Sequence, residues 1–316
     1  MMNSISMICS HLPKVRVPKA VGMNQVIAKN PASAKSGTAE AILPAITRCE
    51  AAQSRNAIGS EYSRFHRCAF WATIAPPAGT IETVAIIKNT LFDFFGTLVE
   101  YSASRTEQGY ERSHQLLRDF GSALDYEAFL NLWSATSEEL DQIANRDLSE
   151  FSMHDVTASF LAHATGAAPT ESMIDQFIAA YIEEWNKGVR YFDGLAAFLA
   201  ELRTRYRLGI VTNTHLAGFV EDHLARMGVA SHFDVIVTSV GEGRRKPHAK
   251  IFLRALEVMN ASPGETVFVG DSYEADYLGS RAIGMECYLI DPSQSADVSA
   301  SNRLSHLFDL RRCLPE

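Results

Sequence analysis

The residues of this 316-residue sequence with the clearest chemical meaning are polar side chains that directly follow short apolar segments. Asp93 and Asp271 each close such a segment, Thr212 closes a third, and Lys246 precedes a helical stretch. Two carboxylates can share a hard divalent cation, and Mg²⁺ favours a few carboxylates together with water and substrate oxygens. A hydroxyl can donate to a phosphoryl oxygen, an ammonium group can neutralise another, and an aspartate can form an acyl-phosphate. These residue types suit phosphoryl transfer if the fold brings them together.

The elements that would position these residues alternate between strand and helix. An apolar, β-branched and aromatic run before Gly96 predicts a central strand with its exit turn. After Tyr191, the pattern predicts helices over 195–206, 216–227, 251–259 and 273–283, and strands over 208–212, 233–238, 266–269 and 287–290. Single helices between strands predict a parallel, doubly wound α/β sheet. Ligands of such sheets bind at the carboxyl ends of the strands, where the polar residues stand.

The segment between the first predicted strand and the rest has a different character. Residues 104–189 show helical periodicity almost throughout, with Gly121 and Gly188 among the breaks, and predict about four helices and no strand. We therefore expect a core domain formed by residues 84–103 and 190–316, with an all-helical domain, residues 104–189, inserted into it.

Four motifs resemble the signatures of the haloacid dehalogenase (HAD) superfamily, and they occur in the family's order. They read "LFDFFGTLV", "GIVTNT", "RRKPHAKIF" and "VFVGDSYEADYLGSRAIGM". The resemblance covers about residues 86 to 292, and the helical insert resembles the helical (type I) cap of that family. It implies a HAD-like Rossmannoid core with an inserted cap.

The resemblance also implies a role for each motif residue. Asp93 would be the nucleophile and a Mg²⁺ ligand, beside the backbone carbonyl of Phe95, and Asp271 would be the second metal carboxylate. Asp276 would hold metal-bound water or orient Lys246. Thr212, Asn213 and Lys246 would bind the transferred phosphoryl group.

Phe95 departs from the family's phosphatases, which carry a second aspartate at this position as general acid and base. Phenylalanine cannot do this work, which typically contributes about 10²–10⁴-fold in rate. The chain then resembles either a phosphatase that replaces the acid, a 2-haloacid dehalogenase whose halide leaves unprotonated, or a weakly active ligand-binding protein. Phosphonoacetaldehyde hydrolases also lack this aspartate, but they use a lysine early in the cap, and residues 104–189 contain only Lys187, at their far end.

Asp271 favours the phosphatase among these alternatives. The dehalogenases carry no aspartate there and need no metal, whereas two neighbouring carboxylates are costly unless a cation lies between them. We therefore predict a Mg²⁺-dependent hydrolase, most simply a phosphatase acting through an aspartyl-phosphate on Asp93.

Specificity is expected to come from the cap as it covers the site. Glu100, Tyr101 and Arg105 lie near the predicted hinge. Polar candidates for substrate contact are Arg105, Tyr110, Arg112 and His114, although surface charge explains such residues more often. Trp133 and Trp185 lie in apolar stripes and are expected to be core, while Arg244 and Arg245 would add positive potential at the pocket mouth or be solvated.

Charge and composition limit the partners. The formal net charge is −8, and residues 1–83 hold nine basic and four acidic residues, so the remainder holds 20 basic and 33 acidic ones. An acidic body matches nucleic acids poorly, yet one pocket lysine can attract a small anionic metabolite. No apolar run is long enough to predict a membrane span. We expect a small anionic substrate, no nucleic acid and no membrane.

Residues 1–83 are basic and interrupted by prolines, and we expect them to be a disordered or targeting extension outside the fold. Five scattered cysteines without a CxxC pair favour a reducing compartment. Both observations fit a cytoplasmic location, or an organellar one if residues 1–40 are a transit peptide.

Overall fold

The computed structural model describes residues 86–102 and 108–314. Expectations that concern residues 1–83, the cysteines among them, and Arg105 therefore lie outside the described residues. Of the remaining cysteines, Cys287 is buried and Cys313 partly buried, and both are free thiols. No described helix has the length and apolarity needed to cross a membrane.

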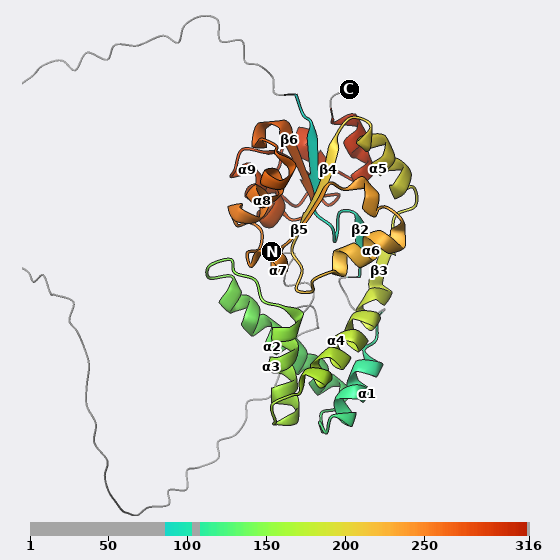
Figure 1. Ribbon diagram of the computed structural model, residues 1–316, viewed down its shortest axis with the longest axis vertical. Helices are drawn as coiled ribbons and strands as arrows, with labels where there is room; N and C mark the ends of the chain where they lie inside the picture. The colour runs from blue at the N-terminus through green and yellow to red at the C-terminus, as the bar shows by residue number, and fades with distance from the viewer. Residues whose placement is uncertain (1–85, 103–107, 315–316) are drawn as a thin grey trace, which may run out of the picture. The chain divides into compact units, whose positions relative to one another are not determined.

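A six-stranded parallel sheet forms the centre of the described structure, as predicted (Figure 1). Its strand order is β5-β4-β1-β6-β7-β8. The strands are β1 (Asn89–Phe92), β4 (Arg207–Thr212), β5 (Val235–Thr238), β6 (Thr266–Gly270), β7 (Glu286–Ile290) and β8 (Arg303–Leu304). β1 lies in the middle with β4 and β6 on either side, so that Phe92 is level with Ile210 and Val269. The exits of these three strands consequently meet at one edge.

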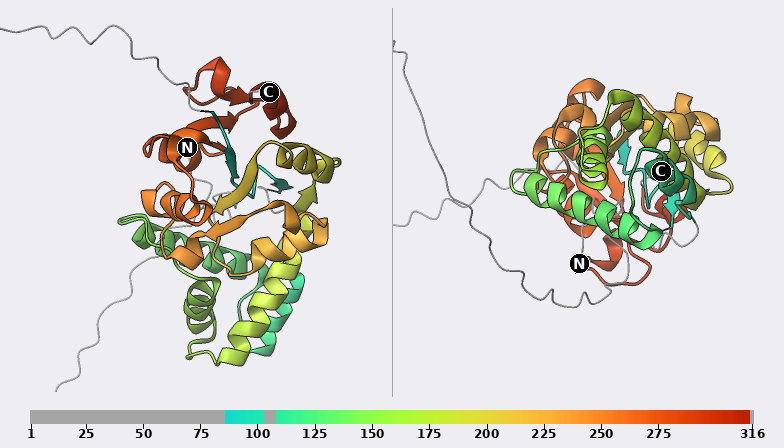
Figure 2. Two further views of the ribbon diagram at one scale, coloured as in Figure 1. Left: turned by 45° about the horizontal axis from the view of Figure 1, so that its top comes forward. Right: turned by 90° about the horizontal axis from the view of Figure 1, so that it is seen from below.

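Helices cover both faces of this sheet (Figure 2). On one face, α5 (Leu195–Arg203) and α6 (Phe219–Met227) pack with η7 (Leu307–Arg312) against Phe92, Ile210 and their neighbours. On the other, α8 (Ala249–Met259) packs against Leu91, Val211 and Phe268. Because neighbouring residues of a strand point to opposite faces, fully buried strands read as continuous apolar runs. The short helix α7 (Ser239–Glu242) and the 3₁₀ turns η3 (Ala230–His232), η4 (Pro263–Glu265) and η6 (Ala300–Asn302) complete the connections.

The insert consists of four helices, as predicted: α1 (Glu111–Asp119), α2 (Tyr126–Ala144), α3 (Met153–Thr165) and α4 (Glu171–Trp185). They share an aromatic core that includes Phe129, Trp133, Phe160 and Phe177. Local signals set their starts, since Asp125 and Thr170 cap α2 and α4, and Ser152 with Asp155 forms a capping box at α3.

A short antiparallel ribbon that the sequence pattern did not predict joins this insert to the sheet. It pairs β2 (Val99–Tyr101) with β3 (Val189–Tyr191), which follows the turn η2 (Asn186–Gly188). Three residues per strand are too few for a recognisable alternation, and the partners are separated by the whole insert.

The expected helix over 273–283 has an unexpected start. η5 (Tyr273–Leu278) is a turn of π-helix, in which the amide of Tyr277 donates to the carbonyl of Ser272, and α9 (Gly279–Arg281) follows. The wider turn lets the Asp276 carboxylate fold back onto the amide of Ser272, 2.9 Å away. π-Helical turns are frequent at functional sites.

Candidate active site

Three acidic residues from two strand exits lie together at the edge of the sheet. Asp93 follows β1 and Asp271 follows β6, while Asp276 lies in η5, five residues further along the chain. One carboxylate oxygen of each residue lies within 4.8 Å of the others. All offered ligands are hard oxygens, and the buried Oδ1 of Asp271 has no hydrogen-bond partner among the described residues. The site therefore fits a magnesium ion by its donor type and by this unpartnered oxygen.

Lys246 brings the positive charge to this cluster. Its side chain is 2% exposed, and Nζ lies 2.8 Å from Oδ1 of Asp93 and 2.6 Å from Oδ1 of Asp276. Burial alone would lower the pKa of Lys246, but the charges of Asp276 and Asp93 outweigh it and hold that pKa above its usual value. Lys246 is therefore charged near neutral pH, and its Nζ donates a hydrogen bond to Asp276.

Three carboxylates against one ammonium leave an excess of negative charge. Burial, followed by the charges of Asp93 and Asp276, raises the pKa of Asp271 well above its usual value. A divalent cation would offset this repulsion between the carboxylates. A phosphate substrate, which is itself negatively charged, would need the same positive charge at the site.

Glycine allows the close approach of the first and last motifs. Gly96 adopts φ of +84°, and a Cβ at this position would lie 2.4 Å from Oδ2 of Asp271. A Cβ at Gly270 would likewise lie 2.3 Å from Oδ2 of Asp276. These two glycines let the main chain touch the carboxylates. The glycine of "FGTL" and the glycine of "VGD" are therefore required by the geometry of the site.

Thr212 is the last residue of β4 and Asn213 follows it, next to the cluster of carboxylates. Thr212 is buried at the end of the strand. The Asn213 side chain holds the main chain of Lys246: its Oδ1 accepts from the amide at 2.8 Å, and its Nδ2 donates to the carbonyl at 3.3 Å. Asn213 thus holds the main chain of Lys246 in place, and its backbone amide and the second N–H of its side chain are the groups with which it could bind a phosphoryl oxygen.

Phe95 belongs to an aromatic cluster, which we call the Phe95 cluster and define by Phe95, Tyr101, Trp185, Phe219 and His223. Ring centroids lie 5.3 Å from Phe95 to Trp185, 5.5 Å to Phe219 and 6.4 Å to Tyr101. The His223 ring lies 5.9 Å away, and its Nδ1 is 2.7 Å from the Tyr191 hydroxyl. Burial lowers the pKa of His223 to about 4, so its imidazole is neutral near pH 7. The position of the family's acid is filled by apolar packing between the sheet and the insert.

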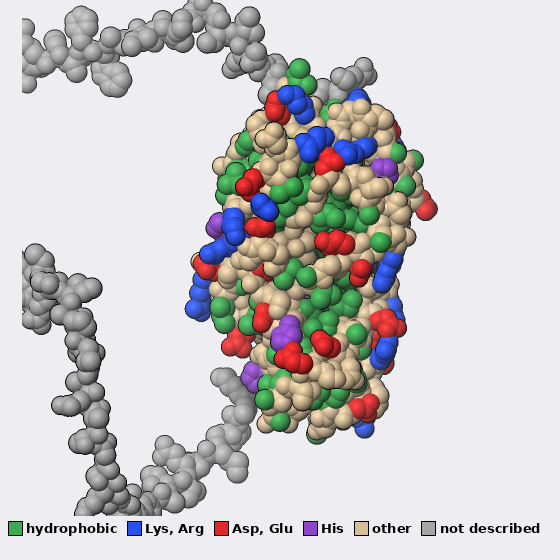
Figure 3. Space-filling model, viewed as in Figure 1, with side chains coloured by type: hydrophobic (Ala, Val, Ile, Leu, Met, Phe, Trp, Pro, Cys, Tyr) green, Lys and Arg blue, Asp and Glu red, His purple; other side chains and the backbone are tan. Residues whose placement is uncertain are grey.

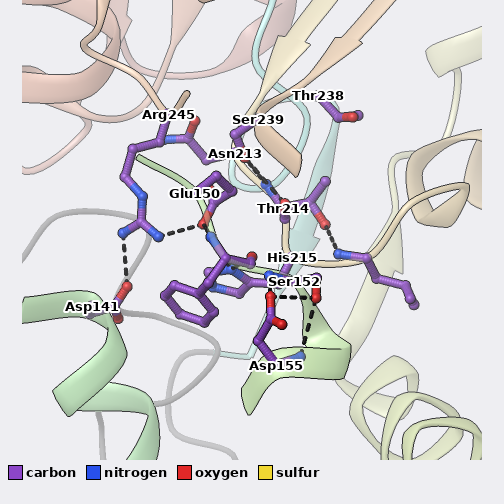
Figure 4. Close-up of polar contacts among 12 residues, drawn as sticks. Asp141, Glu150, Ser152, Asp155, Asn213, Thr214, His215, Thr238, Ser239 and Arg245 are labelled. Atoms are coloured by element: carbon purple, nitrogen blue, oxygen red, sulfur yellow. Dashed lines mark hydrogen bonds and ion pairs between the residues drawn. The ribbon is translucent and has the colours of Figure 1, made fainter. Parts of the chain in front are cut away.

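Arg245 corrects an expectation. Neither solvated nor at a pocket mouth, it is 0% exposed and binds two carboxylates of the insert (Figure 4). Its Nη1 lies 2.8 Å from Oδ1 of Asp141 in α2, and its Nη2 binds Glu150. Nδ1 of His215, three residues after Thr212, lies 3.1 Å from Glu150, and the His215 carbonyl accepts from the amide of Met153 at 2.6 Å. We call Arg245, Asp141, Glu150 and His215 the latch.

The pKa values of the two carboxylates of the latch shift in opposite directions. Burial raises the pKa of Asp141 despite the hydrogen bond from Arg245. For Glu150, burial acts in the same direction, but bonds and charges from His215 and Arg245 outweigh it and lower the pKa. Neither carboxylate was predicted, because "RRK" shows a basic run whereas its partners are 95 and 104 residues away.

Among the described candidates of the insert, Tyr110, Arg112 and His114 make contacts within the insert. Tyr110 is buried against Tyr181, at 4.8 Å between ring centroids, and His114 bonds the Leu124 carbonyl at 2.8 Å. Arg112 forms an exposed ion pair with Glu183. Arg244 pairs with Asp147 at 3.2 Å. Trp133 and Trp185 are buried, as predicted, although Trp185 also belongs to the Phe95 cluster.

Comparisons with known proteins agree with the fold and identify its family. The family model for haloacid dehalogenase-like hydrolases matches residues 90–290. Two curated phosphatases are each 26% identical to this chain. The ribulose-1,5-bisphosphate 5-phosphatase of Halopiger xanaduensis aligns over 67% of this chain and 87% of its own length. The glyceraldehyde 3-phosphate phosphatase of Methanopyrus kandleri aligns over 69% of this chain and 89% of its own length. A crystal structure of 2-haloacid dehalogenase from Pseudomonas syringae has a TM-score of 0.54 and 22% identity, over 72% of this chain and 98% of that one, and so shows a common fold. This chain belongs to the haloacid dehalogenase-like hydrolases and is a hydrolase.

Proposed function

We propose that this hydrolase is a Mg²⁺-dependent phosphatase acting on a small phosphorylated metabolite. The observation that carries the proposal is the buried Lys246 ammonium between Asp93 and Asp276, with the unpartnered Asp271 oxygen beside them. The buried ammonium group can bind an anionic substrate. The carboxylate oxygens, with the unpartnered oxygen of Asp271 among them, can hold the metal ion that offsets the remaining negative charge. The phosphatase names of two relatives that align over most of their length support the same reading.

Asp93 attacks phosphorus in this mechanism. A bond forms between its carboxylate oxygen and phosphorus while the bond to the leaving oxygen breaks, and water then hydrolyses the aspartyl-phosphate. Lys246 neutralises phosphoryl oxygens, Asp276 and Asn213 keep Lys246 in place, and Thr212 donates a hydrogen bond. Asp93, Asp271 and the Phe95 carbonyl would hold Mg²⁺, which supplies positive charge against the carboxylates and the phosphate.

The domain assignment is part of this proposal. Residues 84–103 and 190–316 form the catalytic core, residues 104–189 form the cap that covers it, and residues 1–83 lie outside the enzyme. Two connections between core and insert, the β2–β3 ribbon and the latch, support a cap that contributes one wall of the site.

Halide release is the second candidate, because Phe95 leaves the site without a carboxylate acid and a halide needs none. The two functions separate in one assay. We expect the full chain to hydrolyse p-nitrophenyl phosphate with Mg²⁺ and to stop when EDTA removes the metal. Asp93→Asn should lower kcat by about 10³-fold or more, by analogy with the loss of other nucleophiles.

The matched control is Asp175→Asn, which removes an exposed carboxylate from α4 and should leave kcat unchanged. Chloride release from 2-chloropropionate that EDTA does not affect, without phosphate release, would refute the phosphatase. Absence of both activities would favour a ligand-binding role.

A further inference from the structure

A cavity of about 340 Å³ lies beside the β2–β3 ribbon, and its lining includes Gly96 from the turn that follows Asp93. Among the described residues, its lining is formed by Gly96, Glu100, Tyr101, Ser102 and Arg190. Gly96 connects it to the reaction centre, because its α-carbon faces the Asp271 carboxylate closely enough to exclude a Cβ. Ligand pockets range from about 300 to 1,000 Å³, so this one has room for a small group only.

Tyr101 is held rigidly in this cavity wall. Its ring stacks on Trp185 at 6.4 Å with 16° between the planes, and meets the Phe95 ring edge-on at 6.4 Å. The main chain is fixed as well, since Tyr101 pairs with Val189 in the ribbon. A phenol held on two sides can aim its hydroxyl without losing further rotational freedom.

Tyr101 shares the cavity lining with Gly96, whose main chain lies against the Asp271 carboxylate, and the Tyr101 hydroxyl is free to donate. Burial raises the pKa of Tyr101, and the charges of Asp271 and Asp93 raise it further. Among residues 86–102 and 108–314, no hydrogen bond engages this hydroxyl. The other hydroxyl of the lining, on Ser102, belongs to a residue whose amide donates to the Gly188 carbonyl and whose carbonyl accepts from Gln108.

We propose that the Tyr101 hydroxyl donates a hydrogen bond to the leaving-group oxygen of the phosphate ester, and that the cavity receives a small hydroxylated leaving group. The inference rests on the proposed phosphatase function and extends it to the substrate class: phosphate esters of small polar alcohols. As the P–O bond breaks, its electron pair passes to the leaving oxygen, where a fixed donor stabilises the developing charge. Water supplies the proton to that oxygen and the hydroxide to phosphorus, so the phenol keeps its own proton.

Tyr101→Phe tests this role because it removes the hydroxyl and keeps the ring between Trp185 and Phe95. The readout is the ratio of kcat/KM for glycerol phosphate to kcat/KM for p-nitrophenyl phosphate, both measured with Mg²⁺. We expect kcat/KM to fall about 10- to 100-fold for the alkyl ester, through kcat rather than KM, which is the size of effect that a single oxyanion donor allows. The nitrophenyl ester should change less than about threefold, since nitrophenolate leaves without help.

Tyr191→Phe is the matched control. It removes a phenol hydroxyl from the same ribbon, but one that is bound to His223 and lies outside the cavity lining. Its ratio should equal that of the wild type. Partial misfolding lowers both rates equally, so an unchanged ratio in Tyr101→Phe overturns the proposal. A wild type that hydrolyses neither ester would instead refute the phosphatase function, and the role of Tyr101 with it.

Discussion

At the scale of single residues, the unusual feature is that Phe95 replaces a carboxylate by an aromatic contact. The ring lies in the Phe95 cluster, within 5.5 Å of Trp185 from the insert and of Phe219 from α6. Aromatic pairs of this geometry contribute about 0.5–1.5 kcal/mol each beyond the burial of their area. Phe95 therefore stabilises the junction of sheet and insert at a position where a carboxylate would serve proton transfer.

Phe95→Asp should lower the stability of the protein and supply a carboxyl group for proton transfer. We expect the glycerol phosphate rate to rise relative to the p-nitrophenyl phosphate rate, because only the alkyl oxygen needs a proton. The same variant should also lose unfolding free energy, but less than the about 3–5 kcal/mol that removing a fully buried Phe ring costs, because Phe95 is only partly buried. Steady-state kinetics and urea unfolding would measure both.

Phe95→Leu serves as the control, because it keeps an apolar side chain and brings no acid. It should lose less stability and leave the rate ratio unchanged. Equal acceleration of both esters by Phe95→Asp would mean that Phe95 acts through packing or the shape of the site.

At the scale of elements, the helical insert is attached to the sheet at two separate places. One is the β2–β3 ribbon. The other is the latch, in which Arg245 donates to Asp141 of α2 and to Glu150 of the α2–α3 loop. Arg245 immediately precedes Lys246, and His215 closely follows Thr212 and Asn213. The latch thus joins the insert to the two segments that would hold the phosphoryl group.

Arg245→Met should destabilise the protein by about 3–5 kcal/mol, because it leaves two buried carboxylates without their cation. Adding Glu150→Gln to Arg245→Met should restore part of the loss, which a double-mutant cycle in urea would show. Arg244→Met is the matched control: its pair with Asp147 is more exposed and should contribute less than about 1 kcal/mol. Equal losses from Arg244→Met and Arg245→Met would argue against the latch.

At the scale of the whole molecule, acidic and basic side chains are interspersed on the face that Figure 3 shows. Attraction of an anionic substrate is therefore assigned to the buried Lys246 and to the cation that the carboxylates can hold. These groups, and the contacts described above that position them, lie within residues 86–102 and 108–314.

A chain beginning at Val84 should consequently retain the catalytic activity of the full chain. We expect its kcat/KM for p-nitrophenyl phosphate with Mg²⁺ to stay within about twofold, and its urea midpoint to be unchanged. The comparison needs both proteins purified in parallel. A large loss of activity in the shortened chain would show that residues 1–83 take part in the enzyme.

The sequence by itself determined the class of the sheet and the identity of the residues at its edge. Apolar runs ending in Asp93, Thr212 and Asp271 specify buried parallel strands, and parallel strands necessarily bring their exits to one edge. The same motifs contain Gly96 and Gly270. Only glycine permits the close contacts of these positions with the Asp271 and Asp276 carboxylates. The helical insert was predictable because its periodicity and caps are local.

Only the tertiary structure decided which side chains meet across these elements. Lys246 and Asp276 are 30 residues apart, and Arg245 lies 95 residues from Glu150, so no local pattern could have paired them. The same holds for Phe95, whose neighbours come from the ribbon, α4 and α6. The physical reason is that local propensity and hydrophobic period decide an element and its buried face, whereas the packing of elements decides the partner of each polar or aromatic side chain.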